Sequence, residues 1–135
     1  MIILDANAAF AMVIATPEGE ALWDFVLRGE KILAPEVMKQ ELLNVVGKYV
    51  RAGLATERAA MSWYEKGVSL VDGFVSMEDA RAEILHEATR FGRPVYDMHY
   101  LVLARRFNAT LFTLDGKLSE ICERCGVSNT GVAAF

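Results

Sequence analysis

Residues 1–7, MIILDAN, decide how the rest of the chain is interpreted. Residues 2–4 form a short, β-branched apolar run typical of a buried strand, and Asp5 follows it directly. The pattern returns late in the chain, where LFTLD places Asp115 directly after a predicted strand at residues 111–114. Strand-like and helix-like segments alternate between these two points. That alternation predicts an α/β fold whose parallel sheet is covered by helices on both faces.

The remaining elements are predicted from apolar periodicity, caps and breakers. Thr16-Pro17 fits an N-cap and first-turn proline, Ser76 begins an approximate capping box, and the tail from Gly126 holds at most one more strand. We expect strands at residues 2–4, 31–33, 68–71 and 111–114, and helices at residues 6–15, 17–28, 35–51, 56–66, about 77–91, 97–106 and 117–124.

Length and composition predict a single globular domain over residues 1–135. The chain is 53% hydrophobic and 24% charged, which is typical of a folded rather than a disordered protein. No apolar run approaches the roughly 18 residues of a membrane span. The N-terminus has no basic region before its apolar start, so we expect neither a signal peptide nor a membrane segment, and a cytoplasmic protein.

The charge balance restricts how this chain could hold nucleic acid. Lys and Arg number 14 and Asp and Glu number 18, giving a net charge of −4. A protein that binds nucleic acid by charge alone is therefore disfavoured. Two bound divalent cations would neutralise the net charge of −4, so the acidic composition is compatible with a metal-dependent nuclease. Such a nuclease is expected to bind nucleic acid weakly without metal.

Four acids lie against apolar sequence far apart in the chain: Asp5, Glu41, Asp97 and Asp115. Asp5 and Asp115 follow predicted strands, whose carboxyl ends share one edge of a parallel sheet. Asp97 begins a predicted helix, and Glu41 borders the apolar stripe of another. Each has a simpler interpretation, because aspartate is a favoured N-cap and a glutamate can border a core while solvated.

The acids taken together favour a metal site. Carboxylates about 4 Å apart repel by roughly 4 kcal/mol at an intermediate dielectric, so a converged set must bind a proton or a cation. Oxygen-only ligands favour Mg²⁺ or Mn²⁺ over zinc. One or two such ions can hold a phosphodiester and activate water.

These motifs resemble the PIN-domain ribonucleases, and the length suits the VapC-type toxins of toxin–antitoxin pairs. LDAN, PEVMKQELLNVV, YDMHYLVLA and LFTLD carry the four acids in the family's order, and the resemblance covers essentially the whole chain. It implies a three-layer α/β/α sandwich and an endoribonuclease dependent on Mg²⁺ or Mn²⁺. The four acids would be catalytic metal ligands. The implied partners are an RNA substrate such as tRNA or rRNA, a cognate antitoxin and a second copy of the chain in a homodimer.

The resemblance also implies supporting roles and shows one departure. Asn7 and Thr113 match polar positions that orient ligands or water, although an Asx turn and an ordinary strand residue are equally open. Asn44 is a weaker candidate, as a partner of Glu41 or simply solvated. Many relatives carry a further acid where this chain has Gly116-Lys117. We therefore expect one tightly bound ion and a second recruited with RNA.

The other functional motifs give weaker signals. Cys122 and Cys125 are expected to be ordinary helix cysteines, because the pair lies near a helix end rather than its start. His99 lies about 200° around the helix from Asp97 and should not share its face. Four arginines could contact RNA, but solvent exposure is the default interpretation for them: Arg90, Arg93, Arg105 and Arg106. For three large aromatic side chains the default is packing in the core or against a partner: Trp23, Trp63 and Tyr64.

Two other functions remain open. A receiver-like phosphoacceptor module would need adjacent acids after the first strand, where this chain has Ala6 and Asn7. A non-catalytic PIN-like binding or scaffold protein would keep the fold without cleavage.

Overall fold

The computed structural model describes residues 1–26 and 28–130. Its elements are β1 (Ile2–Leu4), α1 (Ala6–Val13), α2 (Pro17–Val26), β2 (Ile32–Pro35), α3 (Met38–Arg51), α4 (Glu57–Ser69), β3 (Gly73–Val75), the 3-10 helix η1 (Glu78–Ala80), α5 (Arg81–Phe91), α6 (Val95–Phe107), β4 (Thr110–Phe112) and α7 (Gly116–Cys125).

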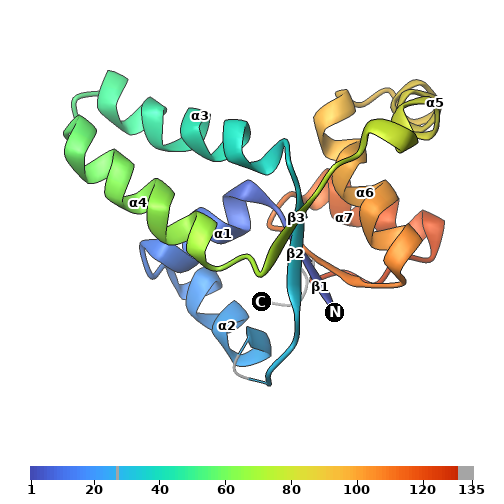
Figure 1. Ribbon diagram of the computed structural model, residues 1–135, viewed down its shortest axis with the longest axis horizontal. Helices are drawn as coiled ribbons and strands as arrows, with labels where there is room; N and C mark the ends of the chain where they lie inside the picture. The colour runs from blue at the N-terminus through green and yellow to red at the C-terminus, as the bar shows by residue number, and fades with distance from the viewer. Residues whose placement is uncertain (27, 131–135) are drawn as a thin grey trace.

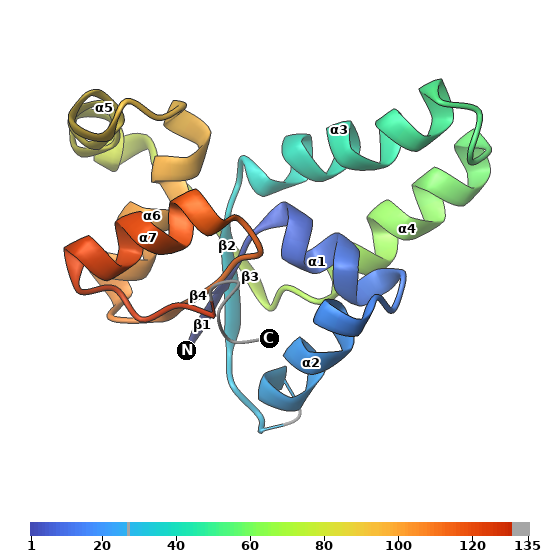
Figure 2. The same cartoon turned by 180° about the vertical axis from the view of Figure 1, so that it is seen from behind.

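The strands pair in the order β3-β2-β1-β4, and all these pairings are parallel. Helices α1–α4 lie on one face of the sheet and α5–α7 on the other (Figure 1), as the view from behind also shows (Figure 2). The predicted three-layer α/β/α sandwich is therefore confirmed. Helices α3 and α6 both begin near the carboxyl ends of the strands, on opposite faces of the sheet (Figure 1).

The core is centred on β1 and α6. All three residues of β1 are buried, and α6 is buried around most of its surface, including Leu101 and Leu103. Rings from α1, α3 and α4 pack together: Phe10 lies 5.1 Å from Tyr49 and 5.7 Å from Trp63 between centroids. Burial of these large apolar surfaces stabilises the helices against the sheet.

Two element predictions were wrong. The strand expected at residues 68–71 is absent, because the first two of these residues continue α4 and the strand lies at Gly73–Val75. Apolar periodicity does not distinguish a helix end from a strand over four residues. Pro35, expected to open a helix, is the last residue of β2 and pairs with Val75.

The start of α6 also differs from the prediction. The helix begins at Val95 with Pro94 as its N-cap, so Asp97 lies inside the first turn and caps nothing. Among the described residues, no helix is long and apolar enough to cross a membrane.

Candidate active site

Asp5 and Asp115 begin the two helices that follow β1 and β4. Oδ1 of Asp5 accepts a hydrogen bond of 2.8 Å from the backbone N–H of Ala8. Oδ1 of Asp115 accepts bonds of 2.9 and 3.2 Å from the N–H groups of Lys117 and Leu118. Both are therefore N-caps, as their simpler interpretation predicted. For Asp115, capping occupies Oδ1 and leaves Oδ2 for other contacts.

Glu41 and Asp97 approach the same place from opposite faces of the sheet. Glu41 lies in the first turn of α3 and Asp97 in the first turn of α6. All four acids line one small cavity of about 30 Å³, together with Ala6, Asn7, Tyr100 and Leu118. That volume is enough for one water molecule or one small ion.

The cavity disfavours negative charge. Burial raises the pKa of Asp5 from its ordinary 3.8 to about 7, with further contributions from the charges of Glu41 and Asp115, and hydrogen bonds from Thr113 and Ala8 oppose the increase. Burial also raises the pKa of Glu41, and the charge of Asp97 adds to it. A cation at this place would oppose both shifts, because a nearby positive charge favours the ionised form of each carboxyl group.

The raised pKa of Asp5 predicts how the stability of the metal-free protein changes with pH. Because the folded-state pKa lies above the unfolded value, Asp5 contributes stability below about pH 4, and this contribution is lost as pH rises through about 7. Asp5→Asn removes the buried charge, so the variant should unfold at higher urea concentration than wild type at pH 8 in EDTA. The difference in urea midpoint between the variant and wild type should be smaller at pH 5, where Asp5 is protonated in the folded protein.

The matched control for that change is Asp24→Asn, which neutralises an exposed aspartate of α2. Urea titrations of the three proteins at pH 5, 6, 7 and 8 measure the effect. Parallel pH profiles for Asp5→Asn and wild type would contradict a raised pKa for Asp5.

The three supporting candidates occupy unlike places. Thr113 is fully buried; its Oγ1 accepts a 3.0 Å bond from the N–H of Asp115, and its side chain also hydrogen-bonds Asp5. Thr113 thus joins two acids from neighbouring strands. Asn7 is exposed and lines the cavity. Asn44 is exposed and is not among the described residues that line the cavity, which leaves the solvated interpretation.

The sequence did not predict the contacts that two residues, Tyr100 and Arg93, make with the acids. Tyr100 donates a 2.6 Å hydrogen bond from its hydroxyl to Oε1 of Glu41. Arg93 donates from Nη2 to Oδ2 of Asp97 at 2.6 Å and to Oδ2 of Asp115 at 3.3 Å. For Tyr100 the available signal is its spacing from Asp97, because a residue three positions further along a helix lies on the same face. Arg93 lies before the start of α6, so helix spacing does not predict its contact.

Comparisons with known proteins identify the family of this chain. A family model described as PIN domain matches residues 2–124. The chain belongs to the PIN domain family. This PIN domain is 27% identical over 124 residues to a protein of Pyrobaculum aerophilum named Ribonuclease VapC3, covering 88% of this chain and 92% of that one. It is 29% identical over 125 residues to Ribonuclease VapC12 of Mycobacterium tuberculosis, covering 89% and 91%.

Solved structures share the fold of this PIN domain. The crystal structure of PAE2754 from Pyrobaculum aerophilum superposes with a TM-score of 0.70 at 23% identity, covering 87% of this chain and 81% of that one. VapBC2 from Rickettsia felis, bound to a DNA fragment from its promoter, superposes with a TM-score of 0.63 at 15% identity, covering 97% and 98%. The match to the family model confirms the predicted resemblance to the PIN family.

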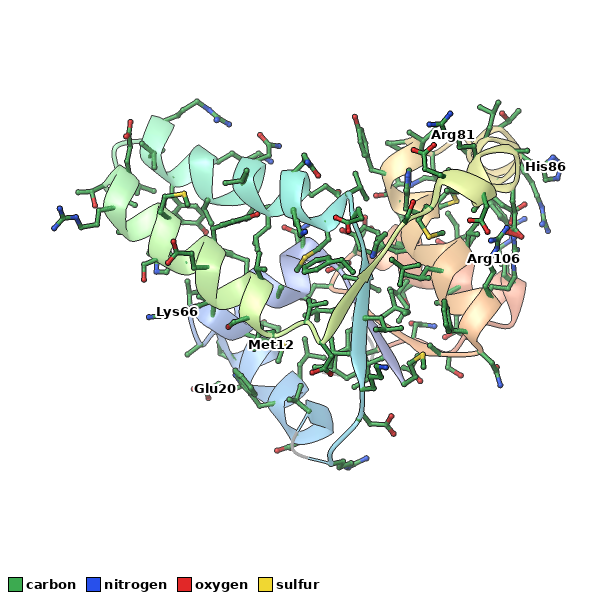
Figure 3. All side chains as sticks on the ribbon, in the orientation of Figure 1. Met12, Glu20, Lys66, Arg81, His86 and Arg106 are labelled. Carbon is green, nitrogen blue, oxygen red and sulfur yellow. The ribbon has the colours of Figure 1, made fainter. Side chains whose placement is uncertain are left out.

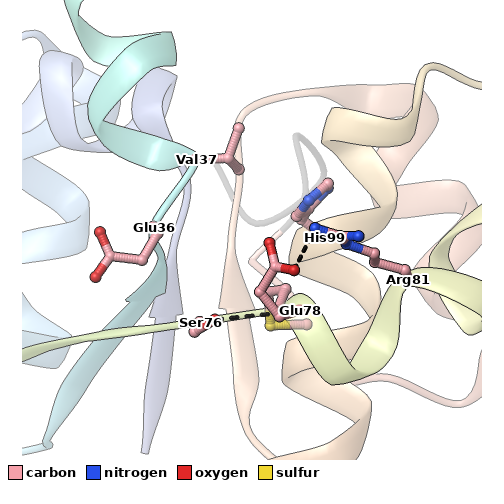
Figure 4. Close-up of a pocket in the computed structure, with 7 residues that line it drawn as sticks. Glu36, Val37, Ser76, Glu78, Arg81 and His99 are labelled. Atoms are coloured by element: carbon pink, nitrogen blue, oxygen red, sulfur yellow. Dashed lines mark hydrogen bonds and ion pairs between the residues drawn. The ribbon is translucent and has the colours of Figure 1, made fainter.

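A second, larger cavity of the PIN domain has a different lining. It measures about 220 Å³ and lies between Glu36 and Val37 on one side and Arg81 and His99 on the other (Figure 4). His99 does not line the acid cavity, and its Nδ1 lies 2.7 Å from the carbonyl oxygen of Val95. The prediction that His99 does not share the face of Asp97 is consistent with this placement.

A cationic group bonds two of the acids that line the acid cavity of the PIN domain. Among the described residues, no three acidic, histidine or cysteine side chains are arranged to hold a metal ion. The guanidinium of Arg93 instead bonds two of the four acids, Asp97 and Asp115. The site thus attracts positive charge, and its oxygen-only donor set fits a hard divalent cation.

Proposed function

We propose that this PIN domain is a metal-dependent endoribonuclease and the toxin of a toxin–antitoxin pair. The observation that carries the proposal is the meeting of four carboxylates from separate segments at one cavity. Acids gathered at such cost in repulsion and burial are typical of a functional site. The names of the relatives, Ribonuclease VapC3 and VapC12, support RNA as the substrate.

Asp5, Glu41, Asp97 and Asp115 would hold Mg²⁺ or Mn²⁺. When bound, such an ion lowers the pKa of a water molecule and neutralises charge on the phosphodiester. The cavity volume of about 30 Å³ suits one ion, and a second would arrive with the RNA phosphate. Gly116 and Lys117, at the place of the further acid of many relatives, supply no carboxylate for that second ion.

The surrounding residues orient the ligands. The Thr113 side chain hydrogen-bonds the Asp5 carboxyl group and accepts from the backbone N–H of Asp115, and the Tyr100 hydroxyl donates to Glu41. Asn7, exposed at the cavity, can hold a water or a substrate oxygen there. In the reaction, water adds to phosphorus, the P–O3′ bond breaks, and a proton passes to the leaving oxygen. The products are a 5′-phosphate and a 3′-hydroxyl.

An antitoxin and a second copy of the chain are the proposed protein partners. Support for the antitoxin comes from the structural similarity to VapBC2 and from the VapC names of the relatives. Co-expression with the product of a neighbouring small open reading frame should abolish growth inhibition by this chain. Light scattering of the free protein tests the homodimer.

Cleavage of a panel of tRNA, rRNA fragments and single-stranded DNA in Mn²⁺, Mg²⁺ or EDTA tests the nuclease. We expect RNA cleavage that requires metal, is lost in Glu41→Gln and is retained in Glu65→Gln, which neutralises an exposed glutamate of α4. Cleavage in EDTA would contradict metal dependence. No cleavage together with no metal-induced rise in melting temperature would favour the non-catalytic binding protein.

A further inference from the structure

We propose that Arg93 is an internal counter-ion of the acid cavity, which a divalent metal ion must displace, and that it thereby sets the metal affinity of the site. The inference rests on the proposed function, because it concerns the same cavity. It assigns Arg93 a role that differs from RNA contact and from simple solvent exposure.

The position of Arg93 is fixed by the connection between α5 and α6. Gly92 ends α5 in the left-handed conformation, with φ of 62°, and Pro94 caps α6. The backbone N–H of Arg93 donates to the carbonyl oxygen of Ala88 at 3.0 Å. The side chain is therefore anchored at its base while its guanidinium extends to Asp97 and Asp115, and it is 20% exposed.

The guanidinium uses oxygens that a metal ion would need. Oδ1 of Asp115 caps α7, so Oδ2, which Arg93 binds, is the oxygen of that carboxylate not used by the cap. Arg93 also binds Oδ2 of Asp97 at 2.6 Å. A divalent cation on the same two oxygens would lie within a few ångströms of the guanidinium, and the two positive charges would repel. The two cations therefore compete.

Arg93 is incompletely satisfied where it lies, which distinguishes it from a structural arginine. Its Nε is buried and has no hydrogen-bond partner in the described part of the chain. Arg105, by contrast, bonds the buried Glu87 at 2.9 Å and lies 3.5 Å from Glu83. A buried donor without a partner costs free energy, so Arg93 loses less than a fully bonded arginine when it leaves the cavity.

The proposal predicts the sign of a change in metal affinity. If Arg93 competes, Arg93→Gln should bind Mn²⁺ about tenfold more tightly, since a charge-assisted bond corresponds to roughly one power of ten or more in an equilibrium constant. If Arg93 only held the two aspartates in place, the same change would weaken Mn²⁺ binding. Arg93→Lys keeps the charge and should bind Mn²⁺ nearly as wild type does.

The experiment is isothermal titration of the EDTA-stripped full chain with Mn²⁺, alongside melting temperatures with and without Mn²⁺. The matched control is Arg106→Gln, which breaks contacts of 3.3 Å to Asp79 and Glu83 on the α5–α6 side of the molecule (Figure 3). We expect tighter binding and a larger Mn²⁺-induced rise in melting temperature for Arg93→Gln alone.

The failure of this inference differs from the failure of the proposed function. If the wild type binds Mn²⁺ and Arg93→Gln binds it equally or more weakly, the proposed role of Arg93 is wrong. The proposed nuclease activity is not affected by that result. Tighter binding in Arg106→Gln as well would overturn it too, because the effect would then follow net charge alone. Absence of Mn²⁺ binding in every protein overturns both the inference and the metal dependence of the nuclease.

Discussion

Asp97→Asn is expected to lower the rate of RNA cleavage by roughly 10³-fold while the protein stays folded. The change keeps the shape of the side chain and removes the charge that would hold the metal ion. It also removes one partner of Arg93. The fold should tolerate it, because Pro94 rather than Asp97 caps α6 and Arg93 keeps its hydrogen bond to Asp115.

The matched control for Asp97→Asn is Asp79→Asn. It neutralises an exposed aspartate of η1 that also contacts an arginine, Arg106. Initial rates on a cleaved RNA in Mn²⁺ and thermal unfolding by circular dichroism measure activity and fold separately. Unchanged cleavage by Asp97→Asn would remove this residue from the site. Loss of cleavage together with loss of folding would contradict the expectation that Asp97 is dispensable for the fold.

Gly19→Ala is expected to destabilise the protein by about 3 kcal/mol or more. A Cβ on Gly19 would lie 2.0 Å from the carbonyl oxygen and 2.2 Å from the carbonyl carbon of Ala11, and 2.6 Å from the backbone nitrogen of Met12. Backbone atoms cannot rotate away as a side chain does, so α1 and α2 must separate. Because Asp5 caps α1, the displacement would also reach the acid cavity.

Gly47→Ala provides the control for an added methyl group. Gly47 lies inside α3, and a Cβ there would approach the Nη1 end of the flexible Arg51 side chain at 3.2 Å. Alanine favours a helix over glycine by up to about 1 kcal/mol, so this variant should match or exceed wild-type stability. Urea denaturation in EDTA compares the three proteins. A Gly19→Ala variant as stable as wild type would contradict the close approach of α1 and α2.

Local sequence predicted an element well where its burial pattern was unambiguous. The run at residues 2–4 is apolar throughout, and the structure buries it as a central strand. The same holds for α6, whose apolar residues surround the helix. The prediction of a strand at residues 68–71 was wrong because a short apolar run fits either a helix end or a strand. The structure assigns the strand to residues 73–75, next to the Asp72 side chain, which accepts a 2.8 Å bond from the N–H of Ile32.

Three features can be predicted from the sequence alone: the four acids, the oxygen-only chemistry they offer, and the placement of Asp5 and Asp115 after strands of a parallel sheet. These depend on residue type and on neighbours within a few positions. Two other features become visible only in the folded chain: Tyr100 bonds Glu41, 59 residues away, and Arg93 bonds both Asp97 and Asp115. Such contacts depend on how α3 and α6 pack against the sheet, and burial by that packing is the main cause of the raised pKa of Asp5.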